Sequence, residues 1–143
     1  DAIGHSDVLC CLESKLSVLQ ECRRVIRVSG RMAFTVISIA PSLSSADYKL
    51  ALGAGPLFME TVVGYPKLLE QSGWRIAHHM DLTLEYAQAA RHMLREEEAR
   101  AEELTRLLGD AEFSARLGRR RKTVQALDGG LLRRELIAAD ARG

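Results

Sequence analysis

The sequence predicts an α/β fold built on a doubly wound sheet. Helix-like and strand-like patterns alternate through the first half of the chain, and a nearly continuous apolar run at 32–39 is typical of a strand covered on both faces. A strongly helical stretch and a final strand pattern follow. The 143 residues, 47% hydrophobic and 27% charged, have the composition of one ordinary globular domain.

The first forty residues predict a strand, a helix and a second strand. Ala2-Ile3 begin as though a strand were already under way, so we expect the chain to be part of a longer protein. Apolar residues spaced by three and four from Leu12 to Ile26 predict a helix over 12–28. Ser29-Gly30 is expected to stop it in a left-handed conformation, before the apolar strand 32–39.

The middle of the chain predicts a long connection, a helix and an edge strand. A Ser-rich break and a Gly-rich break frame residues 41–60, with one short helix around 47–52. Pro66 fits the first turn of a helix that ends at Ser72-Gly73. Residues 74–83 alternate, which predicts one face formed by Trp74, Ile76, His78, Met80 and Leu82 and a polar opposite face.

The last sixty residues are predominantly helical. An apolar stripe predicts a helix over 84–108 that Gly109 ends. Two shorter helices are expected at 110–117 and about 119–128. Gly129-Gly130 then turns the chain into a last strand from Leu131 to Ala139.

Charge and hydropathy exclude several classes of protein. Net charge is +1, with 8 basic and 8 acidic residues in 1–83 and 12 and 11 in 84–143, so neither a nucleic-acid nor a membrane-surface partner is expected. No stretch approaches the roughly 20 apolar residues of a membrane-spanning helix. Cys10, Cys11 and Cys22 lack ligand-type spacing and no signal peptide is visible, which indicates a reducing cytoplasm and no metal site.

Several segments resemble the second half of class I S-adenosylmethionine-dependent methyltransferases, in particular the type 11/12-like members. Segments 1–3 and 7–9 are similar to the Asp-hydrophobic strand of that family, and 19–34 to its helix, Arg-Val-Leu-Lys-Pro-Gly-Gly-like turn and buried strand. Segments 68–74 and 130–135 are similar to its later helix-to-strand step and its final strand. Val28 and Ser29 stand where the family usually has Pro and Gly, in a surface turn.

The resemblance implies a particular topology and domain organisation. The strands of this chain would be the family's fourth to seventh, with the last inserted antiparallel and 74–83 left at an edge. The chain would be a partial methyltransferase domain, with 1–83 as sheet and helices, 84–128 as a helical insertion over the acceptor pocket, and 129–143 as the final strand. The Gly-rich loop and acidic residue that hold the cofactor in that family are absent, and Gly53-Ala54-Gly55 is no substitute because Pro56 follows.

The resemblance also implies the candidate site residues. Residues His5, Ser6, Asp7 and Val8 lie just beyond the family's fourth strand, where the methionine part of S-adenosylmethionine and the acceptor pass. The alternative is that Ser6 or Asp7 caps a helix and that His5 lies at the surface.

Three further clusters have both a functional and a structural interpretation. His79 and Asp81 share a strand face and could act as a base and its orienter, or simply be polar residues of an exposed edge. Cys10 and Cys11 could form a reactive pair or belong to the core. The basic run 119–122 could contact phosphates or be a solvated helix start.

We therefore expect transfer of a methyl group from S-adenosylmethionine to a small-molecule acceptor, with this chain as the acceptor-side half and inactive in isolation. A non-catalytic interaction module with the same fold is the alternative. In either case the uncovered first strand predicts self-association or pairing with an N-terminal half.

Overall fold

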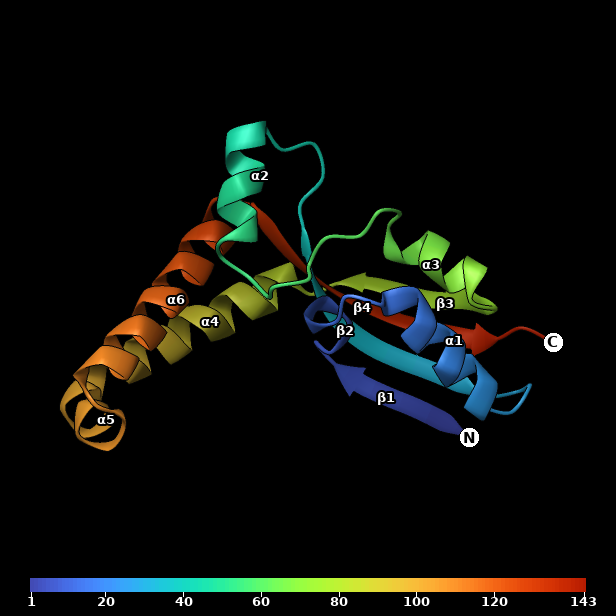
Figure 1. Cartoon of the computed structure of the whole chain (residues 1–143), viewed down its shortest axis with the longest axis horizontal. Helices are drawn as coiled ribbons and strands as arrows, with labels where there is room; N and C mark the ends of the chain where they lie inside the picture. Colours follow the sequence, from blue (N-terminus) through green and yellow to red (C-terminus); the bar gives the residue numbers. More distant parts are fainter.

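The computed structural model describes all 143 residues and has an α/β architecture (Figure 1). The elements follow in the order β1 (Ala2–Ser6), the 3-10 turn η1 (Leu9–Cys11), α1 (Lys15–Val25), β2 (Arg31–Ile39), α2 (Ser45–Leu52), α3 (Tyr65–Gln71), β3 (Trp74–Asp81), α4 (Thr83–Ala99), α5 (Ala101–Leu108), α6 (Asp110–Asp128) and β4 (Leu132–Ala141). No helix is both long enough and apolar enough to span a membrane.

The four strands form one mixed sheet in the order β1-β2-β4-β3. β1 and β2 run parallel, whereas β4 lies between β2 and β3 and is antiparallel to both. This arrangement confirms the predicted antiparallel insertion of the last strand. It also leaves β1 and β3 at the two edges of the sheet.

The larger core lies between one face of the sheet and helices α1 and α3. Alternate β2 residues Met32, Phe34 and Val36 are buried there against Leu19 and Leu69 of the helices. Because both helices cover the same face, Ala33 on the opposite side of β2 stays exposed. The expectation that this strand is covered on both faces is therefore wrong for its first half.

A helical arm of α4, α5 and α6 projects from the carboxyl end of β2 (Figure 1). The bases of α4 and α6 contribute to a second core around Ile37, Met59 and Leu132. The predicted helix 84–108 is divided at Arg100, where α4 ends and α5 begins, and Gly109 follows with φ 85°. The two helices predicted at 110–117 and 119–128 are a single helix, since Gly118 does not interrupt α6.

Two further expectations are corrected by backbone geometry. Gly30 has no positive φ, so it does not stop α1 in a left-handed conformation. A Cβ at Gly30 would lie 2.3 Å from Cγ1 of Ile26, so glycine is required by close packing. In β3 the register shifts between Ile76 and His78, and this bulge moves His78 and Met80 to the face opposite Trp74 and Ile76.

Candidate cofactor and acceptor site

The candidate site begins at the turn that follows β1. Asp7 has φ 53°, a left-handed conformation that is uncommon for a residue other than glycine. Its backbone N–H donates to the Thr35 carbonyl oxygen at 2.9 Å, which continues the β1–β2 pairing one residue beyond β1. The turn is thus held at the carboxyl ends of two parallel strands, where doubly wound folds bind their ligands.

A polar network fixes the Asp7 side chain. Arg134 of β4 donates from Nη2 to Oδ2 at 2.9 Å and from Nε to Oδ1 at 3.3 Å. The Thr35 hydroxyl donates to Oδ1 at 3.0 Å and lies 2.9 Å from the Ser6 hydroxyl oxygen. The Arg134 guanidinium also lies over the Tyr86 ring, 5.1 Å from its centroid. Residues from β1, β2, β4 and α4 therefore determine the shape of one turn.

The predicted site residues divide between this network and the core. Ser6 and Asp7 belong to the network, and Val8 is 42% exposed beside it. The His5 ring stacks on Phe34 with centroids 5.0 Å apart, and neither ring nitrogen has a hydrogen-bond partner. Burial lowers the pKa of His5, which favours the neutral imidazole. His5 can therefore face the crevice only through its backbone.

Sequence patterns missed Thr35, Arg134 and Tyr86. Each lies within an apolar strand or helix pattern and looks like a solvent-facing residue of that element. One usable signal was the charged pair Arg133-Arg134 in a strand that the resemblance places inside the sheet, since buried strands rarely carry an unpaired charge.

A cavity of about 270 Å³ lies between loop 53–56, α4 and α6 at the carboxyl end of β2. Tyr86 lines this cavity and also supports Arg134, so the cavity adjoins the Asp7 network. Arg119 is its one charged lining residue, and the Thr123 hydroxyl closes one side by donating to the Ala54 carbonyl at 2.6 Å. The other lining residues are Ile37, Gly53, Gly55, Pro56 and Leu132.

The structure does not join His79 to Asp81. His79 Nε2 lies 2.8 Å from Glu135, which also accepts from the Ser38 hydroxyl at 2.7 Å. Asp81 instead accepts from the Thr83 N–H at 2.8 Å, in the first turn of α4. The base-and-orienter interpretation of this pair is therefore not supported. No group of three or more His, Cys, Asp or Glu side chains forms a metal site.

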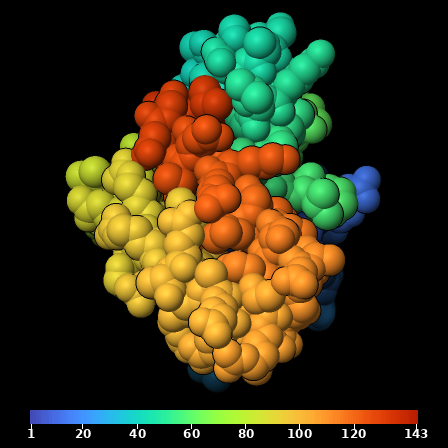
Figure 2. Space-filling model, turned by 90° about the vertical axis from the view of Figure 1, so that its left-hand side faces the viewer, coloured from blue at the N-terminus to red at the C-terminus, as the bar shows by residue number.

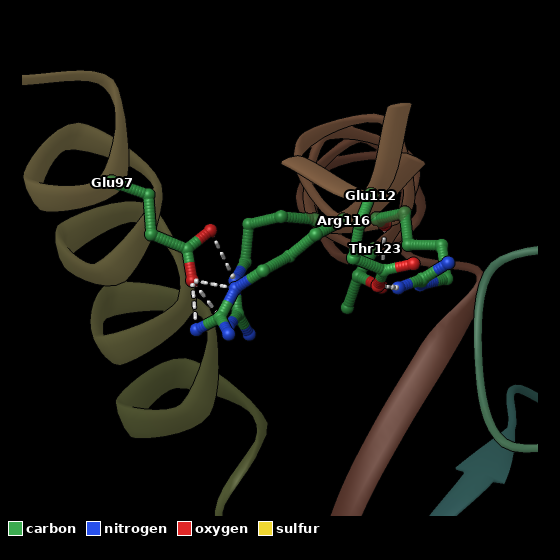
Figure 3. Close-up of polar contacts among 6 residues, drawn as sticks. Glu97, Glu112, Arg116 and Thr123 are labelled. Atoms are coloured by element: carbon green, nitrogen blue, oxygen red, sulfur yellow. Dashed lines mark hydrogen bonds and ion pairs between the residues drawn. The ribbon is translucent and has the colours of Figure 1, made fainter. Parts of the chain in front are cut away.

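The remaining clusters have structural partners. Cys10 is fully buried, burial raises its pKa, and its thiol points to the Asp7 carbonyl; Cys22 is half-buried. The arginines of the run 119–122 bind carboxylates of the arm: Arg119 binds Glu112, Arg120 binds Glu97 and Arg121 binds Glu98. Figure 3 labels Glu97 and Glu112, the carboxylates of two of these pairs. The run lies inside α6 and is not a helix start.

No protein-family model and no curated protein matches the sequence. Solved structures do match. A protein named as a sarcosine dimethylglycine methyltransferase from Galdieria sulphuraria is 17% identical, with TM-score 0.86 over 99% of this chain and 52% of that one. Phosphoethanolamine N-methyltransferase 2 from Haemonchus contortus, in complex with S-adenosylhomocysteine, is 10% identical, with TM-score 0.84 over 100% and 34%. A mycolic acid cyclopropane synthase is 10% identical, with TM-score 0.83 over 98% and 55%.

The chain has the class I methyltransferase fold. It spans between about a third and just over half of the length of these structures, and it corresponds to their C-terminal part. The sheet order read from β1 to β3 is the order that the resemblance implies for the family's fourth, fifth, seventh and sixth strands.

Within this fold, the Asp7 turn lies at the carboxyl end of β1 and is fixed by its side-chain contacts. The Asp7 carboxylate is engaged by Arg134 and Thr35, and the Ser6 hydroxyl is bonded to the same two residues, so both side chains shape the turn, whereas Val8 beside them is exposed. Gly55 does not form a second ligand loop. A Cβ there would lie 2.3 Å from the sulfur of Met59, so the absence of a side chain serves packing.

Proposed function

We propose that this chain forms the acceptor-side half of an S-adenosylmethionine-dependent methyltransferase that acts on a small molecule. The observation that carries the proposal is the Asp7–Arg134 network, which holds the turn after β1 near a cavity of about 270 Å³. The cavity suits a small acceptor, since its volume is just below the range of about 300–1,000 Å³ that is usual for ligand pockets. The three free cysteines of the chain are compatible with a cytoplasmic enzyme.

The chemistry requires little from this half beyond alignment. The cofactor supplies a methyl group on a sulfonium, and displacement needs the acceptor atom in line with that group. Ser6, Val8 and the backbone of His5 and Asp7 would contact the methionine part of the cofactor. The Tyr86 ring and the apolar walls would orient the acceptor, and the arm would exclude water from it.

Names of the similar structures support a small acceptor. One is named for sarcosine and dimethylglycine, and another is in complex with phosphomonomethylethanolamine. The exposed edge of β1 supports the alternative, an interaction module without the cofactor, because such an edge can pair with another chain.

Calorimetric titration with S-adenosylhomocysteine tests the proposal and separates it from the alternative. The isolated chain lacks a Gly-rich loop and a ribose-binding carboxylate. Each unmade charged hydrogen bond costs about 1.5–3 kcal/mol, so we expect affinity to fall from micromolar to about millimolar or weaker. A protein in which a Gly-rich strand-loop-helix half precedes this chain should bind the cofactor and transfer methyl groups.

Two results would overturn the proposal. Micromolar binding by the isolated chain would place the cofactor elsewhere. A joined protein that folds but binds no cofactor would favour the interaction module. Arg134→Met in the joined protein should weaken cofactor binding. The matched control is Arg133→Met, which lies on the same strand but has no carboxylate partner and should leave cofactor binding unchanged.

A further inference from the structure

A cavity of about 510 Å³ lies outside the candidate acceptor site. It separates the last turn of α2 from the C-terminal half of α6, and Figure 2 shows these two segments facing each other on one side of the molecule. It shares Gly53 and Ala54 with the acceptor-side cavity, and the other lining residues of the two cavities differ. The two cavities are therefore neighbouring but distinct.

Two lysines line this cavity from opposite sides. Lys49 is in the last turn of α2, and Lys122 is in α6. Neither forms an ion pair, although the three arginines that precede Lys122 all do. No carboxylate lines the cavity, so the charge of the two lysines is not neutralised by a group of its lining.

The rest of the lining is largely apolar. Ala54 and Ala126 are buried at 9% and 4% exposure, and Leu131 and Leu50 extend the apolar surface outward. Gln125 adds an amide that can donate or accept a hydrogen bond. The cavity thus combines an apolar floor with two cations and lies within the usual size range of small-molecule sites.

We propose that this cavity is a second ligand site, which binds a small amphipathic anion with a phosphate or carboxylate head and a short hydrocarbon part. The head would bridge Lys49 and Lys122, and the hydrocarbon would cover Ala54, Ala126 and Leu131. A free molecule fits better than a membrane, because the lysines face each other across a cavity between helices and the net charge of the chain is only +1. The site does not depend on methyl transfer.

Titration of the full 143-residue chain with octyl phosphate, below its micelle concentration, tests this site. We expect saturable, enthalpy-detected binding that inorganic phosphate and octanol each fail to reproduce, since one lacks the tail and the other lacks the charge. The double variant Lys49→Gln with Lys122→Gln should weaken octyl phosphate binding about tenfold or more. The matched control is Arg95→Gln, which removes a cation that forms no ion pair and does not line the cavity.

A second variant tests the cavity without changing its charge. Gln125→Trp places a large side chain in the cavity from the exposed surface of α6, and it should abolish binding while far-ultraviolet circular dichroism stays unchanged. Equal binding by the wild type and the lysine double variant would overturn the proposal. So would flotation with phosphatidic-acid vesicles in the absence of octyl phosphate binding, because that result would indicate a membrane-surface patch.

Discussion

Arg133 and Arg134 are sequence neighbours on β4, yet only Arg134 holds a carboxylate. Its side chain is 24% exposed and that of Asp7 is 28% exposed, so the pair is partly screened from water. We expect Arg134→Met to lower the free energy of unfolding by about 1–3 kcal/mol, because it leaves Asp7 without its partner in a strained turn. Urea denaturation measures the change.

Arg133→Met provides the comparison, since Arg133 is exposed and forms no ion pair. Its effect should stay within about 0.5 kcal/mol. Equal losses from both substitutions would mean that the Asp7 turn does not depend on Arg134.

Substitution by alanine should have opposite effects on stability at two glycines. Gly30→Ala would place a Cβ 2.3 Å from Ile26, whose side chain is buried, so we expect a loss of about 1–3 kcal/mol. Gly118 lies inside α6 with nothing within 4 Å of an added Cβ, so Gly118→Ala should stabilise by about 0.5–1 kcal/mol. Thermal denaturation should show a lower midpoint for Gly30→Ala and a higher midpoint for Gly118→Ala. A stable Gly30→Ala variant would show that Ile26 can move aside.

The arm is held together by a buried carboxylate. Glu97 of α4 is 9% exposed, and Arg116 and Arg120 of α6 donate to it at 2.9 Å and 3.1 Å (Figure 3). Burial alone would raise the pKa of Glu97, but hydrogen bonds and charge from both arginines outweigh it and keep the pKa below its ordinary value. Glu97 thus joins α4 to α6.

This ion pair predicts a pH dependence. Because the Glu97 pKa is lower in the folded than in the unfolded chain, its stabilisation is present above the ordinary glutamate pKa of about 4.3 and is lost as pH falls through the folded value. Glu97→Gln should therefore cost about 1–3 kcal/mol at pH 7 and progressively less below about pH 4. Urea titrations across this range measure it.

Glu98→Gln is the control for that series. Glu98 is 41% exposed and pairs with the exposed Arg121, so its loss should cost less than about 1 kcal/mol. If the loss of unfolding free energy in Glu97→Gln does not change with pH, the effect is due to packing and not to the ion pair.

Shortening the arm should affect acceptor binding and cofactor binding differently. Deleting all of 84–128 would expose the second core, because Ala87, Ala90, Ala126 and Leu127 belong to it. Replacing only 96–121 by a short Gly-Ser linker removes both partners of each ion pair in that segment, so no charge is left unpaired. It keeps the ends of α4 and α6 that pack on the second core, including the Arg91–Asp128 ion pair. In a protein with a cofactor-binding half, acceptor affinity and turnover should fall while cofactor affinity stays within about twofold. Equal loss of both would make the arm a structural part only.

At the scale of the whole molecule, the sheet has an unpaired edge at β1 and an uncovered face beside it. β1 is an unpaired edge, and Ala2, Gly4 and Ala33 are exposed on the face that no helix covers. We expect concentration-dependent self-association, because such an edge and face can pair with a second chain. Light scattering after size-exclusion chromatography should detect it.

Gly4→Lys should shift this equilibrium toward the monomer. An added Cβ there meets only the Ala33 carbonyl, at 3.9 Å, so the lysine adds charge to the open face without strain. Gly118→Lys adds the same charge to the arm and should leave association unchanged. A wild-type chain that stays monomeric at high concentration contradicts the prediction.

The amino-acid sequence by itself determined the type and order of most elements. Pro66 and Gly73 bound α3, Gly109 ends α5 with positive φ, and the apolar run 32–39 is β2, all as their local patterns predict. These features depend on interactions within a few residues, which a sequence displays directly. The resemblance to methyltransferases supplied the sheet order, which local patterns do not contain.

Only the tertiary structure decided which side chains meet. Asp7 and Arg134 are 127 residues apart, and their contact depends on β4 entering the sheet antiparallel between β2 and β3. Glu97 is buried because α6 folds back along α4, and the bulge at Ala77 reverses the faces of β3. Periodicity describes one element at a time, whereas burial of a charge and the face of a strand depend on partners that distant segments supply.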